Sequence, residues 1–262
     1  MSNSQMFSPA DPWPMPALSD CRFYHCMDFP DGESVSGPWD IRGQFEQYIG
    51  NYPISGKTVL DVGTASGFLA FSAERAGATV TTLELKNVAE INLLPFASQT
   101  YFQDNRVAWE DLVEKDWRII KNSFWYAWHK YASKVEMIYV PLRKLKYWNR
   151  KFDVVIAGAI LEHLADPVSA IGDISRLAKE AVIIAFTPVG PESDLLMRTA
   201  NDWSTPEHCY TWWTLSLGLY KRVFDNVGFD VEFLPALAKT NRESVSRYTI
   251  VAKRRRRDTT SV

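Results

Sequence analysis

Residues 58–85, TVLDVGTASGFLAFSAERAGATVTTLEL, decide how the rest of this chain is interpreted. The run TVLDV at 58–62 is apolar and rich in β-branched residues, which predicts a buried strand. Small residues fill 63–67, where a chain can turn tightly and a ligand can approach its backbone. Residues 68–76 predict a helix with dense apolar positions, and residues 79–85 predict a second strand. The stretch is therefore a βαβ unit, and a right-handed crossover makes its two strands parallel.

The turn and the end of the second strand together indicate a nucleoside site. A ligand at the carboxyl edge of such a sheet lies against the turn and the helix N-terminus. Glu84 follows the turn by about 20 residues, which is the spacing expected of an acid that accepts hydrogen bonds from ribose hydroxyls. The alternative is a βαβ turn that binds nothing, because a motif by itself is only a hypothesis.

The glycine spacing separates two kinds of nucleoside ligand. Dinucleotide-binding turns read G-x-G-x-x-G, whereas this turn has only Gly63 and Gly67, with Ala65 between them. Asp61, two residues before the first glycine, is also foreign to an NAD-binding turn. The run DVGTASGFL resembles the first motif of class I S-adenosylmethionine (SAM) methyltransferases, with alanine at the middle glycine position. A loop of small residues can absorb that departure.

Length and composition bound the class of protein. A chain of 262 residues with 46% hydrophobic residues fits one α/β domain with additions. A net charge of −2 gives the whole protein no attraction to phosphate backbones. Three cysteines without a C-x-x-C pair fit a reducing compartment. The sequence has neither an apolar stretch of membrane-spanning length nor a signal peptide, so we expect a cytoplasmic protein without a membrane partner.

Predicted strands alternate with predicted helices and end in a hairpin. The strands are expected at residues 58–62, 79–85, 134–140, 152–159, 181–186, 230–237 and 247–253. The helices are expected at residues 39–49, 68–76, 167–178 and 212–227. This order predicts an α/β fold with a doubly wound, seven-stranded, Rossmann-like sheet whose seventh strand is antiparallel. The SAM methyltransferases that the turn resembles have this topology.

Three further segments accompany the predicted sheet. Residues 1–38 are expected to form an N-terminal arm, because four prolines between positions 9 and 16 forbid a helix and favour an extended or mobile segment. The methyltransferase-like domain is expected over 39–253, with a helical insertion at about 86–133 that holds four of the ten tryptophans. Residues 254–262 are expected to form a solvated basic tail.

The family resemblance extends beyond the turn. Residues 152–167, FDVVIAGAILEHLADP, resemble the fourth SAM motif. FYH at 23–25, WDIR at 39–42 and WW at 212–213 resemble the tRNA (mo5U34) methyltransferase-like branch, so that the resemblance covers about residues 23–252. The resemblance implies SAM as the cofactor. It is specific for SAM binding and not for the substrate of that branch.

The roles of the family carry over to matching residues of this chain. Those implied to bind SAM are Asp61, Gly63, Thr64, Ala65, Ser66 and Gly67 for the methionine part, Glu84 with Leu85 for the ribose, Pro141 and Leu142 for adenine, and Ala159 and Ile160 along the methionine chain. The acid that such enzymes usually place beside adenine is not obvious here. Arg42 is implied to pair with a carboxylate of SAM or of the substrate, and a surface ion pair is the equal alternative.

Two histidines are candidates for catalysis. His163 lies just past the fourth predicted strand, in the region where a base could accept a proton from the methyl acceptor. His25 lies in the arm, which we expect to fold over the pocket. For both histidines a packing or positioning role is the alternative. No metal site is expected, because the cysteines and histidines lack the spacing of a structural zinc site.

The aromatic residues supply the candidate substrate contacts. These are Tyr24 in the arm, Trp125 and Trp128 in the insertion, and Trp213. Core packing between the insertion helix and the sheet is the alternative for the two insertion tryptophans.

Three classes of function remain open. We favour methyl transfer to a small molecule with an aromatic or apolar portion by in-line displacement, for which the protein mainly supplies alignment and a dry cavity. A tRNA wobble-uridine modifying methyltransferase or carboxymethyltransferase is the alternative, less favoured because the basic residues are balanced by acids. A non-catalytic SAM-binding relative is the third. The methyl acceptor, a carboxylated form of the donor and the oligomeric state are left open by the sequence.

Overall fold

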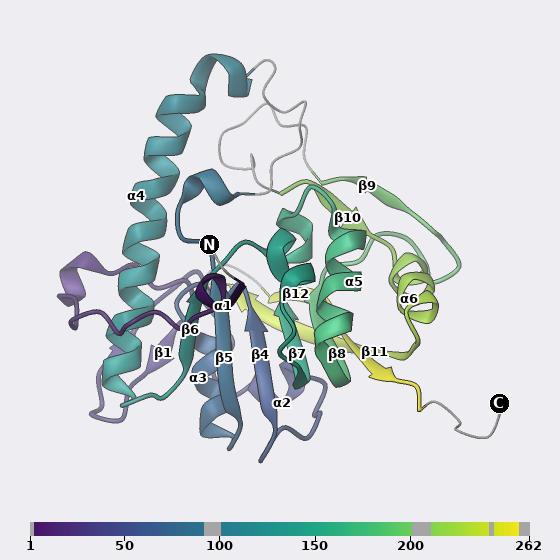
Figure 1. Cartoon of the computed structure of the whole chain (residues 1–262), viewed down its shortest axis with the longest axis horizontal. Coiled ribbons are helices and arrows are strands. Elements are labelled where there is room, and N and C mark those ends of the chain that lie inside the picture. Colours follow the sequence, from purple (N-terminus) through teal and green to yellow (C-terminus); the bar gives the residue numbers. More distant parts are fainter. Residues whose placement is uncertain (1–2, 92–100, 201–210, 241–243, 257–262) are drawn as a thin grey trace.

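An eight-stranded sheet forms the centre of the protein, in a computed structural model that describes residues 3–91, 101–200, 211–240 and 244–256 (Figure 1). In spatial order its strands are β3 (Trp39–Asp40), β11 (Phe229–Thr240), β12 (Ser244–Arg254), β8 (Ala178–Phe186), β7 (Phe152–Gly158), β4 (Thr58–Val62), β5 (Thr79–Glu84) and β6 (Glu136–Tyr139). The strands from β8 to β6 are parallel, whereas β12 is antiparallel to both of its neighbours. The predicted α/β fold and antiparallel hairpin are confirmed, and β3 adds an eighth strand at the edge.

Helices cover both faces of the sheet (Figure 1). The α-helices are α1 (Asn3–Met6), α2 (Phe45–Tyr48), α3 (Phe68–Arg75), α4 (Tyr101–Lys130), α5 (Pro167–Leu177) and α6 (Leu217–Asn226). The short 3-10 helices are η1 (Leu18–Asp20), η2 (Val88–Glu90), η4 (Leu142–Tyr147) and η5 (Leu161–His163). Two small antiparallel pairs join β1 (Met27–Asp28) to β2 (Ser34–Val35) and β9 (Met197–Thr199) to β10 (Trp213–Leu215). Residues of α5 and α6 pack on one face, and residues of α2, α3 and α4 pack on the other.

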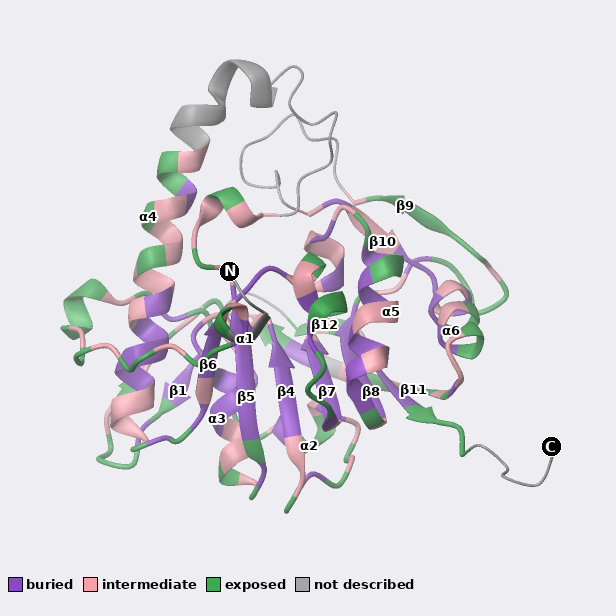
Figure 2. Cartoon of the chain, in the orientation of Figure 1, coloured by how far each residue is buried: buried purple, intermediate pink, exposed green. Residues whose placement is uncertain are grey.

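The central strands are buried on both faces, as Figure 2 shows. Val59 and Leu60 on β4 are both fully buried, and they pack into the cores on opposite sides of the sheet. Val154 and Val155 on β7 are divided in the same way. Successive side chains on a strand point to opposite faces, so a strand covered by helices on both sides needs a continuous apolar run. The near-continuous apolar runs in the sequence thus fold as the middle layer of three.

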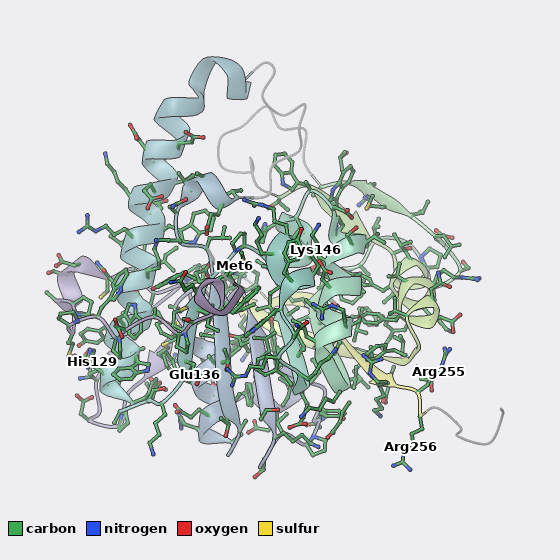
Figure 3. The ribbon with its side chains drawn as sticks, viewed as in Figure 1. Met6, His129, Glu136, Lys146, Arg255 and Arg256 are labelled. Atoms are coloured by element: carbon green, nitrogen blue, oxygen red, sulfur yellow. The ribbon has the colours of Figure 1, made fainter. Side chains whose placement is uncertain are left out.

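The N-terminal arm is extended and docks against the domain. The ring of Phe7 stacks on Trp148, with ring centres 4.9 Å apart. Farther along, a ring nitrogen of His129, labelled in Figure 3, lies 2.8 Å from the carbonyl oxygen of Trp13. Prolines have no backbone N–H and hold an extended backbone, so the segment at 9–16 forms no helix. The N–H of Ala10 donates a hydrogen bond to the carbonyl oxygen of Met137 on β6 at 2.7 Å.

Two of the predicted helices are shorter than the sequence pattern indicates. The segment predicted as a helix at 39–49 begins as strand β3 and contains Gly43 with a φ of 68°, so only α2 is helical. The helix predicted at 212–227 begins later because β10 occupies its start and the Ser216 side chain caps α6. Both segments pair with distant strands, and the energy of that pairing exceeds the weak helix preference of the local sequence.

The basic residues at the end of β12 contact the domain, although the sequence predicts a solvated tail there. Arg254 donates hydrogen bonds to the carbonyl oxygens of Ser175 (2.5 Å) and Ala178 (2.9 Å), just where α5 ends. Its guanidinium also lies 4.4 Å from the centre of the Phe229 ring. A cation at the end of a helix satisfies free carbonyls and interacts favourably with the helix dipole.

We therefore expect Arg254→Ala to lower the free energy of unfolding by about 1–2 kcal/mol, because it removes charge-assisted hydrogen bonds at the end of α5. Arg256→Ala is the matched control, since Arg256 is exposed and points away from the domain in Figure 3. Urea unfolding followed by circular dichroism measures both variants. Equal stabilities of the two variants would contradict this role of Arg254.

Candidate active site

A cavity of about 590 Å³ opens at the carboxyl ends of the parallel strands. Many of the residues that the sequence analysis assigns to a site contribute to its wall. Those that line it are Tyr24, His25, Gly63, Thr64, Ala65, Glu84, Leu85, Pro141, Leu142, Ala159, Ile160 and His163. The structure thus brings the turn after β4, the ends of β5, β6 and β7, and the arm to one place.

The turn after β4 has the backbone of a glycine-rich loop even where glycine is missing. Ala65 has a φ of 49°, the left-handed conformation that a glycine at this position would adopt easily. Gly63 has a φ of 77°, and a Cβ added there would lie 2.8 Å from the side chain of Ile160. Glycine is therefore required at position 63, whereas alanine at position 65 is accommodated at a cost in backbone strain.

Glu84 lies in the cavity wall with its carboxylate held by the backbone. One carboxylate oxygen accepts a hydrogen bond from the Leu85 N–H at 2.8 Å, and the other accepts one from the Ala65 N–H at 3.2 Å. Burial raises the pKa of Glu84, and these two hydrogen bonds oppose that rise. Each carboxylate oxygen can accept a further hydrogen bond, so the group can also receive the two hydroxyls of a ribose.

Asp61 lies beneath the turn and is fully buried. Its Oδ2 accepts a hydrogen bond from the Thr82 hydroxyl at 3.1 Å, and its Oδ1 has no partner among the residues that the structure describes. Burial raises the pKa of Asp61 to about 6. An unpaired buried carboxylate oxygen below a ligand-binding turn fits the implied role toward the charged methionine part of SAM.

Besides Asp61, three of the predicted cofactor residues lie outside the described lining of the cavity. Arg42 forms ion pairs with Asp40 (2.7 Å) and Asp28 (2.8 Å) on the protein surface, as the alternative interpretation expects. Ser66 is buried, and its hydroxyl accepts hydrogen bonds from backbone N–H groups of the arm. Gly67, with a φ of 91°, begins α3 and packs against aromatic rings. The last two residues shape the turn from behind.

Three of the four candidate substrate residues also lie outside the described lining, since their indole N–H groups bond within the protein. The indole N–H of Trp125 donates to the Tyr139 hydroxyl at 3.0 Å. The indole N–H groups of Trp128 and Trp213 donate to backbone carbonyls at 3.2 and 3.1 Å. For the two tryptophans of α4, the structure agrees with the core-packing alternative. Tyr24 alone of the four lines the cavity.

An earlier part of α4 contacts the cavity, and the sequence analysis does not identify it. Val113, Trp117 and Ile120 line the cavity near the end of β6. Their spacing places them on the face that carries the aromatic stripe, about one to three turns before it. The periodicity was visible in the sequence, but the direction in which α4 crosses the sheet edge was not.

Two further cavity residues come from elements that contact each other only in the fold. Tyr48 at the end of α2 and Arg247 on β12 both line the cavity. Gly158 at the end of β7 leaves room for Tyr48, because an added Cβ would lie 2.9 Å from the tyrosine hydroxyl oxygen. A glycine closing an apolar strand was the sequence signal for a close approach at this point.

The two candidate histidines differ in their surroundings. Nδ1 of His163 lies 3.2 Å from the Thr211 hydroxyl, which orients the ring in the cavity wall. His25 packs against the ring of Phe68, with ring centres 5.4 Å apart. Burial lowers the pKa of His25 to about 3, and the nearby positive charge of Arg247 contributes to that change. His25 is therefore neutral at physiological pH and is a weak proton acceptor.

The described part of the chain contains no group of three or more histidine, cysteine, aspartate or glutamate side chains arranged to hold a metal ion. In the same residues, no helix has both the length and the apolar character needed to cross a membrane.

Residues 43–233 match the family model described as a methyltransferase domain. The ubiquinone biosynthesis O-methyltransferase of Paracidovorax citrulli (strain AAC00-1) is 28% identical over 166 residues, which cover 58% of this chain and 56% of the relative. The protein of the same name from Klebsiella pneumoniae (strain 342) is 26% identical over 167 residues, covering 58% of this chain and 55% of the relative. The chain thus spans about half the length of these curated relatives. Neither comparison supports the tRNA (mo5U34) branch.

Solved structures agree with the fold. Magnesium protoporphyrin IX methyltransferase from Synechocystis PCC 6803, solved with bound SAH, has a TM-score of 0.52 at 14% identity, and the match covers 80% of each chain. The 1,6-didemethyltoxoflavin-N1-methyltransferase of Burkholderia thailandensis has a TM-score of 0.50 at 13% identity, with 82% of this chain and 78% of that chain covered. At these identities the likeness concerns the fold.

The buried carboxyl of Asp61 predicts a pH-dependent stability. Its pKa is about 6 in the folded protein against 3.8 as the ordinary value, so the folded state binds more protons than the unfolded state between these pH values. The free energy of unfolding therefore falls as the pH rises from about 4 to about 6. We expect Asp61→Asn to be more stable than the wild type at pH 7.5 by roughly 3 kcal/mol, with no difference below about pH 4. A constant difference across pH in urea unfolding would contradict this.

Proposed function

This chain belongs to the family of methyltransferase domains, and from that membership we propose that it methylates a small molecule with an aromatic or apolar portion, using SAM as the methyl donor. The observation that carries the proposal is the Glu84 carboxylate, held by the turn after β4 at one end of a cavity that continues to aromatic residues at the other. SAM supplies a methyl group that is already activated on a sulfonium. The protein residues then have to align it, exclude water and manage the proton of the acceptor.

The donor half of the cavity follows the ends of β4, β5, β6 and β7. Glu84 would accept the ribose hydroxyls, and the turn at 63–65 would contact the methionine part together with Ala159 and Ile160. The residues that would enclose adenine are Pro141, Leu142, Val113, Trp117 and Ile120. The last three are apolar or aromatic, and the acids Glu90 and Asp116 also line the cavity.

The acceptor half is built from the arm, α2 and the terminal hairpin. Its described lining includes the rings of Tyr24, His25, Trp39 and Tyr48. Aromatic walls with few polar groups are typical of sites for small apolar ligands. The curated relatives are named as O-methyltransferases, which supports a hydroxyl oxygen as the methyl acceptor.

A hydroxyl group loses its proton when its oxygen is methylated. We propose that His163 accepts that proton. It lies in the cavity wall just after β7, and its contact with the Thr211 hydroxyl orients the ring. His25 is less suited, since a pKa of about 3 leaves it little tendency to take a proton at pH 7. We assign to His25 a role in positioning the acceptor.

Binding of SAH, measured by isothermal titration calorimetry, tests the donor site. We expect a wild-type Kd in the micromolar range, about −8 kcal/mol. Glu84→Ala should weaken binding about 30-fold, because it removes charge-assisted hydrogen bonds to the ribose. Glu232→Ala is the matched control, since this exposed acid pairs with Lys253. Equal binding by both variants would remove the donor assignment.

Methyl transfer to a panel of phenols and catechols, followed as SAH formation, tests the acceptor site. We expect His163→Gln to lower kcat about 100-fold while SAH binding stays unchanged, because a general base acts only on the chemical step. No SAH formation with any member of the panel by the wild type, or full activity of the variant, would contradict the assignment.

A further inference from the structure

Arg247 lines the cavity on the side of β7 opposite to the donor residues. It is on β12, which pairs with β8, and β8 in turn pairs with β7. Neighbouring strands are about 4.8 Å apart, so β12 lies about 10 Å along the sheet from β7. The turn and Glu84 follow β4 and β5, on the other side of β7. Arg247 therefore belongs to the acceptor half of the cavity.

The guanidinium of Arg247 lies over an aromatic ring and pairs with no acid among the residues that the structure describes. It is 4.3 Å from the centre of the Trp39 ring. Its Nε is buried without a hydrogen-bond partner, and none of the ion pairs among the described residues involves it. By contrast, Arg42 and Arg255 each bind two carboxylates. Arg247 is half-buried, and a cation whose Nε is withdrawn from water without a hydrogen bond is unfavourable, a cost that a bound anion would reduce.

Other groups in the cavity agree with this placement. Burial raises the pKa of Tyr48 and lowers the pKa of His25. The positive charge of Arg247 opposes the rise at Tyr48 and adds to the fall at His25, so both side chains lie within its field. Glu162 and Asp61 are the acids that act on Tyr48, and neither forms an ion pair with Arg247 among the described contacts. Nδ1 of His25 is also buried and has no partner in the described part of the chain. A cation and an unused ring nitrogen thus face the same space.

We propose that Arg247 binds a carboxylate of the methyl acceptor, which makes an aromatic or apolar acid the substrate class. The proposal rests on the proposed function, since it names the acceptor of the same site. A planar guanidinium forms two parallel hydrogen bonds to a carboxylate, and stacking on Trp39 fixes its plane in advance. His25 offers Nδ1 as a further contact to the same group.

The first test compares an acid with its neutral amide. SAH-loaded protein is titrated with 3,4-dihydroxybenzoic acid and with 3,4-dihydroxybenzamide by isothermal titration calorimetry. We expect the wild type to bind the acid at least tenfold more tightly than the amide. Arg247→Gln should abolish this preference, and Arg247→Lys should keep part of it because the charge remains. Arg150→Gln is the matched control, since Arg150 pairs with Glu136 on the surface.

The second test separates the acceptor from the donor, because the methionine part of the donor also carries a carboxylate. SAH and 5′-methylthioadenosine, which lacks that carboxylate, are titrated into the wild type and Arg247→Gln. We expect the variant to bind both within threefold of the wild type, which also shows that it is folded. Loss of SAH binding alone would assign the arginine to the donor and overturn the proposal.

The remaining outcomes are also decisive. Equal binding of acid and amide by SAH-loaded wild type, or binding of neither, overturns the role of Arg247 and leaves the donor site intact. Failure of the wild type to bind SAH overturns the proposed function, and this inference with it.

Discussion

The hydrogen bond from the Ala65 N–H to the Glu84 carboxylate is the constraint on which the site depends. Parallel pairing of β4 with β5 sets Val62 opposite Leu83, so the turn after one strand and the acid at the end of the other lie at the same height. The left-handed backbone at Ala65 then directs its N–H toward the carboxylate. The β4–β5 register, the turn after β4 and Glu84 therefore form one unit. A slip of one residue in that register would turn the Glu84 side chain to the other face of the sheet.

This unit could be predicted from the sequence because all of its parts lie within 28 consecutive residues, 58–85. The strand, turn, helix and strand follow from local patterns, and the position of Glu84 follows from spacing alone. The sequence predicts that a loop of small residues can absorb alanine at the middle of the turn. The structure gives Ala65 the left-handed backbone that a glycine would adopt there. The order of the central strands was equally accessible, because alternation of strands and helices restricts the topology.

The rest of the site depends on contacts between distant segments, which no local pattern encodes. The aromatic stripe of α4 was read correctly as a helix face, but the packing of α4 turns Trp125 into the core and Trp117 into the cavity. Tyr48 and Arg247 reach the cavity only after α2 and the terminal hairpin have joined the sheet. Arg42 belongs to a motif of the family, but it forms ion pairs with acids on the protein surface instead of reaching the cavity.

The resulting cavity has an electrostatic direction. A carboxylate, Glu84, lies at the end of β5, and a cation, Arg247, lies on β12 across the sheet. Both groups are partly removed from water, where charges interact more strongly than on the surface. A ligand pair with hydroxyls at one end and an anion at the other can enter in only one orientation without leaving a charge unpaired. Alignment of this kind is what an in-line displacement requires, because the reacting atoms must lie on one axis. The two charged groups thereby determine where the methyl group faces the acceptor.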